Sequence, residues 1–149
     1  MREVCISKNM NYNLKTTNWK KDKHALSEIR TTVFINEQNV PEALEWDEFD
    51  KDCIHMLVTD NTNTPIACGR LKPDGHIGRM AVLKKYRKTG IGTSILKQLL
   101  KAAKNMNLTK VYLHAQTTAI PFYEKQGFKT CSDEFMDANI PHKSMKKII

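Results

Sequence analysis

The strongest constraint on the fold is a glycine loop that lies between a strand-like run and a strongly amphipathic helix. The run Met80-Ala81-Val82 comes first, the loop Arg87-Lys88-Thr89-Gly90-Ile91-Gly92 follows, and a helical pattern begins after it. The apolar residues of that pattern recur at spacings of three and four and share one helical face: Ile95, Leu96, Leu99, Leu100, Ala103 and Met106. The segment therefore predicts a strand–loop–helix unit in which the helix packs on a sheet.

The same loop predicts a binding site for phosphate groups. The first N–H groups of a helix have no intrahelical partner, and the helix dipole favours an anion at that end. Glycine lets a phosphate approach the backbone without a Cβ in the way. The alternative is a glycine turn with solvated lysines, because the loop matches neither the Walker pattern nor the dinucleotide fingerprint. Four cations lie in or just before the loop: Lys84, Lys85, Arg87 and Lys88.

The remaining pattern predicts one mixed α/β (α+β) domain over residues 1–149, built on a mostly antiparallel sheet. Apolar spacing predicts a helix over 22–36 and a short helix over 117–128 that ends at Gly127. Asp74-Gly75 predicts a two-residue type I′ hairpin turn, and the mostly apolar strand 110–116 is expected to be buried on both faces. The other predicted strands are 11–18, 53–60, 65–72, 76–83, 128–136 and 142–148.

Composition excludes several classes of protein. The 149 residues carry 24 Lys and Arg against 16 Asp and Glu, a net charge of +8, and 40% are hydrophobic. The apolar content excludes a disordered chain, and no run approaches the ~20 apolar residues of a membrane-spanning helix. Because residues 1–13 show no apolar signal-peptide core, we expect a cytoplasmic protein whose four cysteines are free thiols. A basic chain attracts polyanions, so nucleic acid is an alternative partner, although no nucleic-acid-binding motif supports it.

Two motifs together resemble a known superfamily. The loop has the form R-x-x-G-x-G, and the run Phe122-Tyr123-Glu124-Lys125-Gln126-Gly127-Phe128 follows it about thirty residues later. This combination resembles the GNAT superfamily of acyl-CoA-dependent N-acetyltransferases, and the resemblance covers nearly the whole chain. Further residues are similar to its ElaA-like branch: Val33 to Pro41, Glu45, Asp47, Asp50, His55 and Ile77-Gly78-Arg79.

The resemblance implies a sheet of six to seven strands with a V-shaped split between two central strands, where acetyl-CoA binds. Backbone groups of Met80, Ala81 and Val82 would pair with the pantetheine arm. Ala119 and Phe122 would cover the other side, and no metal is implied. Backbone N–H groups of the loop would hold the pyrophosphate: Arg87, Lys88, Thr89, Gly90, Ile91 and Gly92.

The implied chemistry is direct attack of an amine on the thioester in a ternary complex. Tyr123 matches the family's general-acid position, and a phenol pKa near 10 keeps such a group protonated at neutral pH. The candidates for the base are His55, whose type of side chain titrates near neutral pH, and the carboxylates Glu37, Glu45 and Asp47. Weaker candidates are the other histidines considered: His76, His114 and His142.

Substrate-binding roles fall to Asp47, Arg70 and Arg79, which should border the acceptor cleft. The alternative is that the two arginines pair with nearby carboxylates and shape the pocket. The acidic island at 42–52 either attracts a cationic acceptor or forms a solvated loop with helix caps.

The sequence thus predicts an N-acetyltransferase acting on a small-molecule or peptide amine, as a monomer or homodimer. A GNAT-fold protein that binds acyl-CoA without turnover is the alternative within the same fold.

Overall fold

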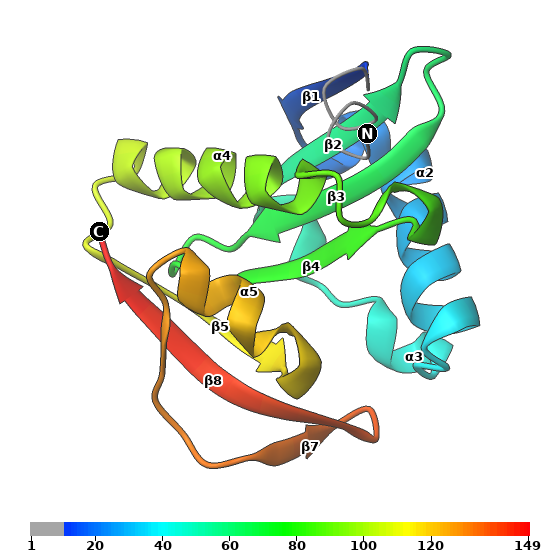
Figure 1. The fold of residues 1–149 in the computed structure, drawn as a ribbon. Helices are drawn as coiled ribbons and strands as arrows, with labels where there is room; N and C mark the ends of the chain where they lie inside the picture. The colour runs from blue at the N-terminus through cyan, green and yellow to red at the C-terminus, as the bar shows by residue number, and fades with distance from the viewer. Residues whose placement is uncertain (1–10) are drawn as a thin grey trace, which may run out of the picture.

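The computed structural model describes residues 11–149, which form two antiparallel sheets that meet between β4 and β5 (Figure 1). Residues 1–10 of the expected domain lie outside the described residues. The first sheet has the order β1 (Tyr12–Thr17), β2 (Ile54–Asp60), β3 (Pro65–Leu71), β4 (Ile77–Val82). In the second sheet β8 (Ile140–Ile148) pairs with β5 (Lys110–Gln116), β6 (Lys129–Thr130) and β7 (Phe135–Asp137).

The helices confirm the three helical predictions and add short turns. The predicted helix 22–36 is α2 (Trp19–Arg30) continued by a π-helical segment η1 (Thr31–Glu37), and the helix after the glycine loop is α4 (Ile91–Asn105). The segment 117–128 contains a 3₁₀ turn η4 (Thr117–Ala119) and the helix α5 (Ile120–Lys125). Short turns complete the set: α3 (Glu42–Glu45), η2 (Asp50–Asp52) and η3 (Lys84–Tyr86).

The first sheet carries a helix on each face. The apolar stripe of α4, including Ile95 and Leu99, joins the main core with residues of β2, β3 and β5. A second cluster on the opposite face brings Leu26 and Ile29 of α2 against Leu57 of β2. Since both faces are covered, β2 and β3 are buried over most of their length. Within residues 11–149 no helix is both long and apolar enough to cross a membrane.

Among residues 11–149 the strands of the two sheets pair at one point only, which confirms the expected V-shaped split. His76 and Tyr112 form an isolated parallel bridge, in which the Tyr112 N–H donates to the Gly75 carbonyl over 3.1 Å. Beyond this bridge, β4 and β5 do not pair anywhere in the part of the chain that the structure describes. The edge of β4 that faces β5 is therefore open along the remainder of the strand.

A bulge in β4 lies where the split begins. Arg70 pairs with Gly78 and Cys68 pairs with Ala81, so two residues of β4 stand opposite the single Gly69. One of the two is Arg79, whose φ of 50° is uncommon for a residue with a side chain. The bulge redirects the backbone of β4 away from β5 at this point.

The β3–β4 hairpin forms as predicted, but the predicted type I′ turn is wrong. That turn needs positive φ at both central residues, whereas only Gly75 has it (97°), and Asp74 does not. The Gly75 N–H donates to the Lys72 carbonyl over 3.0 Å, and the Lys72 N–H donates to the His76 carbonyl over 2.9 Å. Pro73, with its fixed negative φ, occupies the second position of this longer turn.

Strand β5 is buried on one face only, so the prediction of burial on both faces is wrong. Its core face holds Val111, Leu113 and Ala115, whereas His114 on the other face is exposed. The apolar run misled because its intervening residues are a tyrosine and a histidine, which tolerate partial exposure. Three cysteines in the described range, Cys53, Cys68 and Cys131, are free thiols, and Cys5 lies outside it.

Replacing Gly69 with alanine should destabilise the fold. A Cβ at this position would lie 2.8 Å from both the Ile95 Cγ2 and the Met80 Sδ, closer than real contacts allow. Overpacking of this kind costs about 1–3 kcal/mol, measurable by urea denaturation. The matched control is Gly78→Ala on the facing strand, where an added Cβ meets no atom within 4 Å. Equal stability of the two variants would contradict this account of the bulge.

Candidate active site

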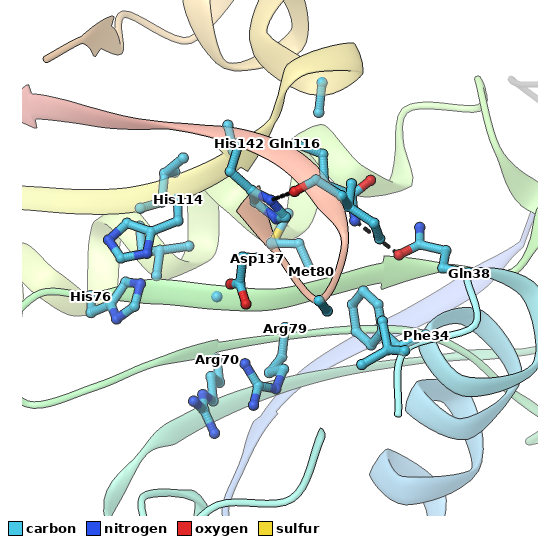
Figure 2. Close-up of a pocket in the computed structure, with 18 of the residues that line it drawn as sticks. Phe34, Gln38, Arg70, His76, Arg79, Met80, His114, Gln116, Asp137 and His142 are labelled. Atoms are coloured by element: carbon cyan, nitrogen blue, oxygen red, sulfur yellow. Dashed lines mark hydrogen bonds between the residues drawn. The ribbon is translucent and has the colours of Figure 1, made fainter. Parts of the chain in front are cut away.

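A cavity of about 250 Å³ opens in the split between the two sheets (Figure 2). Its wall is formed by Arg79 and Met80 of β4, by residues of β5 and β8, by Phe34 of η1 and by Tyr123 of α5. Two polar groups close one end, where the Gln116 amide donates to the Gln38 side-chain oxygen over 2.8 Å. Five elements from distant parts of the sequence thus converge on one concave site.

The glycine loop lies next to this cavity, at the start of α4. Gly90 caps the helix in the left-handed conformation (φ 89°), and Lys88 is also left-handed (φ 64°). A Cβ built on Gly90 meets no atom within 4 Å, so there is open space before the first turn. A Cβ on Gly92 would lie 3.5 Å from the Phe122 ring, which places α5 against the start of α4. The loop and the α5 residues predicted to share a ligand are therefore neighbours.

Arg87 uses its side chain to fix the loop to two other segments. Its Nε donates to the Val82 carbonyl over 2.8 Å, and its terminal nitrogens donate to both carboxylate oxygens of Glu37 over 2.6 and 2.7 Å. Hydrogen bonds from Arg87 lower the pKa of Glu37 below its ordinary value. Glu37, a predicted base, does not line the cavity, and its pairing makes it a poor proton acceptor.

Three arginines and three carboxylates form an ion-pair network below the cavity. Arg30 donates to Glu45 and to Asp50, each over 2.8 Å, and its side chain is 1% exposed. The Arg70 guanidinium also pairs with Asp50, over 2.8 Å, and with Asp47, over 2.7 Å. The acidic island is therefore neither wholly solvated nor a free anionic surface, because its inner carboxylates are bound to arginines.

The third arginine, Arg79, joins the β4 bulge to this network. Its Nε lies 3.0 Å from the Glu45 carboxylate, and its terminal nitrogen lies 3.2 Å from Asp47. Glu45, another predicted base, lines the cavity but is almost fully buried and held by two arginines. Burial by itself would raise the pKa of Asp47, but the hydrogen bonds and charge of Arg70 lower it to about 2. The geometry fits the interpretation that these arginines shape the pocket.

His55, one of the predicted candidates for the base, lies outside the cavity. It is 1% exposed, packs near Trp19, and its Nε2 lies 2.8 Å from the Asp50 carbonyl. Burial lowers its pKa below the ordinary value. Its position behind the ion-pair network separates it from the split between the sheets.

Tyr123 lines the cavity as the sequence led us to expect. Its side chain is 9% exposed, packs edge-on against Phe122 and Phe128, and burial raises its pKa to about 12. Among the described residues, its hydroxyl has no hydrogen-bond partner. The cavity wall therefore contains a protonated phenol whose O–H has no partner among residues 11–149.

Sequence reasoning underrated three histidines that line this cavity: His76, His114 and His142. Figure 2 shows His76 and His114 together at one end, with ring centroids 4.9 Å apart, and His142 beside Gln116 at the other. Burial, and then the charge of His114, lowers the pKa of His76 to about 4. The signal that could have found His114 and His142 is strand alternation, which places them on the same face as Gln116.

Comparison with known proteins identifies the family. Residues 20–149 match the model of the acetyltransferase (GNAT) domain. The chain is 42% identical over 123 residues to the uncharacterized N-acetyltransferase YjcF of Bacillus subtilis, covering 80% of this chain and 87% of that protein. An acyl-CoA N-acyltransferase structure from Pseudomonas aeruginosa superposes with a TM-score of 0.83 at 28% identity, covering 92% and 99% of the two chains. Escherichia coli ElaA superposes with a TM-score of 0.81 at 25% identity, covering 91% and 99%.

The chain therefore belongs to the GNAT acetyltransferase family and, by its likeness to ElaA, to the ElaA-like branch. The predicted fold class is confirmed, although residues 11–149 form eight strands in two sheets rather than one sheet of six to seven.

The ion-pair network makes a prediction about stability and pH. Because the pKa of Asp47 falls from 3.8 to about 2 on folding, its contribution is present above pH 4 and lost as pH falls through 2. Between pH 6 and pH 2 the unfolding free energy of wild type should therefore fall by on the order of 2 kcal/mol more than that of Asp47→Asn. Urea denaturation from pH 2 to pH 6 measures this difference. The exposed neighbour variant Glu48→Gln should follow the wild-type curve, and a parallel curve for Asp47→Asn would contradict the network's role.

Proposed function

We propose that this protein is an N-acetyltransferase that moves the acetyl group of acetyl-CoA to a primary amine of a small molecule or peptide. The observation that carries the proposal is that α5 lies against both the split and the start of α4. Met80 and Ala119 line the cavity together with Tyr123, and the adjacent Phe122 contacts the start of α4 at Gly92. A long ligand can therefore reach from the loop to the phenol without crossing the core.

The residues present fit a coenzyme A ligand. Beyond the bridge to β5, the open edge of β4 offers backbone groups that can pair with the pantetheine amides as a strand would. Arg87 already occupies the Val82 carbonyl, and Ala81 faces Cys68 of β3 in the ladder, which leaves the Val82 N–H and the backbone of Met80 for this pairing. The free N–H groups at the start of α4 and the space before Gly90 suit the pyrophosphate. The bound cosubstrate supplies the activated acetyl thioester.

Tyr123 would serve as the acid at the departing sulfur. Its raised pKa keeps the phenol protonated throughout the neutral range, so its O–H can donate as the thiolate forms. Burial of the sulfur in the same apolar surroundings raises the thiol pKa as well, which favours transfer of the proton. Arg70 and Arg79 would act on the acceptor indirectly, through the wall that they hold with Asp47.

The first test combines ligand binding with turnover. A ligand at one hundred times its Kd stabilises a protein by about 2.7 kcal/mol, which a thermal-shift measurement detects. Acetyl-CoA and CoA should raise the melting temperature, whereas ATP and a short RNA should not. Release of the CoA thiol is then followed with spermidine, glucosamine and lysine amide as acceptors. Stabilisation by RNA but by neither form of CoA would overturn the proposal in favour of nucleic-acid binding.

A glutamate at position 92 should abolish most of the cofactor affinity. Gly92 lies in the first turn of α4, so a carboxylate there adds both bulk and like charge beside the pyrophosphate. Isothermal titration with acetyl-CoA should show an affinity loss of about tenfold or more, since 1.4 kcal/mol corresponds to tenfold. Gln98→Glu adds the same charge to an exposed position farther along the same helix and should bind normally. Unchanged affinity in Gly92→Glu would remove the pyrophosphate from this loop.

Removing the phenol oxygen of Tyr123 should slow turnover but preserve cofactor binding. In Tyr123→Phe the ring still packs against Phe122 and Phe128, and only the donor is lost. A lost general acid lowers kcat by about 10²-fold or more. Steady-state kinetics and acetyl-CoA titration separate the two effects. A variant with wild-type kcat would leave Tyr123 as a packing residue only.

A further inference from the structure

His142 is the one cavity histidine whose tautomer is set by the backbone. It lies on β8 with 8% of its side chain exposed, and its Nδ1 is 2.6 Å from the Ile140 carbonyl oxygen. A carbonyl oxygen can only accept a hydrogen bond, so Nδ1 carries the hydrogen. In the neutral ring the lone pair is then on Nε2, which is the nitrogen farther from the backbone.

The ring of His142 is also fixed in orientation. It stacks on Phe135 of β7 at a centroid distance of 5.9 Å and an interplanar angle of 21°. In the β5–β8 register His142 stands opposite Gln116, whose amide is itself held by Gln38. Figure 2 shows the His142 ring near Gln116, with Gln38 on the far side of that residue. A proton acceptor works best when it is held in position in this way.

The other charged groups that line the cavity near His142 are either acidic or already engaged by a partner. His114 of β5 and Tyr123 of α5 line the same cavity, and both are neutral groups at neutral pH. Asp137 of β7 also lines the cavity and has no ion pair among residues 11–149, so its carboxylate favours a positive charge nearby. The cations of the facing wall are Arg70 and Arg79, which are paired with carboxylates, and Lys72, which lies over the Phe49 ring.

We propose that His142 is the residue that takes the proton from the attacking amine, an inference that rests on the proposed acetyltransferase function. The other candidates are less suited to this step. Glu37 and His55 lie outside the cavity, and Glu45 is bound to two arginines. His76 and His114 line the cavity, but no hydrogen bond within the described residues fixes the tautomer of either ring.

The step balances without any further reactant. The neutral amine nitrogen attacks the thioester carbonyl carbon, the new C–N bond forms, and the nitrogen passes one proton to Nε2 of His142. The C–S bond then breaks, and the thiolate takes a proton from the Tyr123 hydroxyl. The imidazolium releases its proton to solvent and the phenolate regains one, which leaves an amide and free CoA.

The decisive variant is His142→Asn, because it separates the structural bond from the proton acceptor. The asparagine amide nitrogen can occupy the place of Nδ1 and still donate to the Ile140 carbonyl, but no group replaces Nε2. With the best acceptor among spermidine, glucosamine and lysine amide, kcat should fall about 10²-fold. The acetyl-CoA affinity and melting temperature should stay close to wild type.

Two control variants make the result specific. His24→Asn changes a histidine whose side chain is 98% exposed on α2, and it should leave kcat unchanged. His114→Asn changes the neighbouring cavity histidine and should lower kcat less than His142→Asn does. A wild-type kcat in His142→Asn, or a larger loss of kcat in His114→Asn, would overturn the inference. Failure of wild type to bind acetyl-CoA would instead overturn the proposed function, which the binding measurement detects separately.

Discussion

The ion-pair network of Arg30, Arg70 and Arg79 is the constraint on which the site depends. Their ion pairs hold Glu45 and Asp50, which come from two short turns, beneath the first sheet. This arrangement forms one wall of the cavity. Buried charges of this kind stabilise little as complete pairs, but loss of one partner costs about 3–5 kcal/mol because a charge is left uncompensated. The main role of the network is therefore to fix the position of the chain segments that it joins. The cavity would change shape if any member of the network were lost.

The same ion pairs also stabilise the bulge in β4. Arg79 has a left-handed conformation that costs a residue with a side chain on the order of 1–3 kcal/mol, and its guanidinium bonds to Glu45 and Asp47 hold it there. Gly69 makes the arrangement possible, because the Met80 side chain occupies the space where a Cβ would be. The split between the sheets thus arises from a local backbone irregularity that the ion pairs keep in place.

The sequence predicted the elements whose signals are local. The apolar stripe of α4, the glycine loop before it and Tyr123 in its short helix were all placed correctly by spacing and motif. What the sequence could not predict depends on register and long-range pairing. Whether His55 or His142 faces the split is decided by strand pairing, and the pairing of Arg87 with Glu37 joins residues fifty positions apart. Likewise, Pro73 altered a turn whose Asp-Gly pair alone suggested another geometry.

The bidentate bond between Arg87 and Glu37 has a consequence for how a phosphorylated ligand is attracted. The sequence places four cations at the glycine loop, but the charge of Arg87 is already neutralised by its partner. The long-range field at the mouth of the site therefore comes from Lys84, Lys85 and Lys88. In the proposed function the lysines would govern how fast the anionic coenzyme arrives, and Arg87 would govern how rigid the loop is when it does.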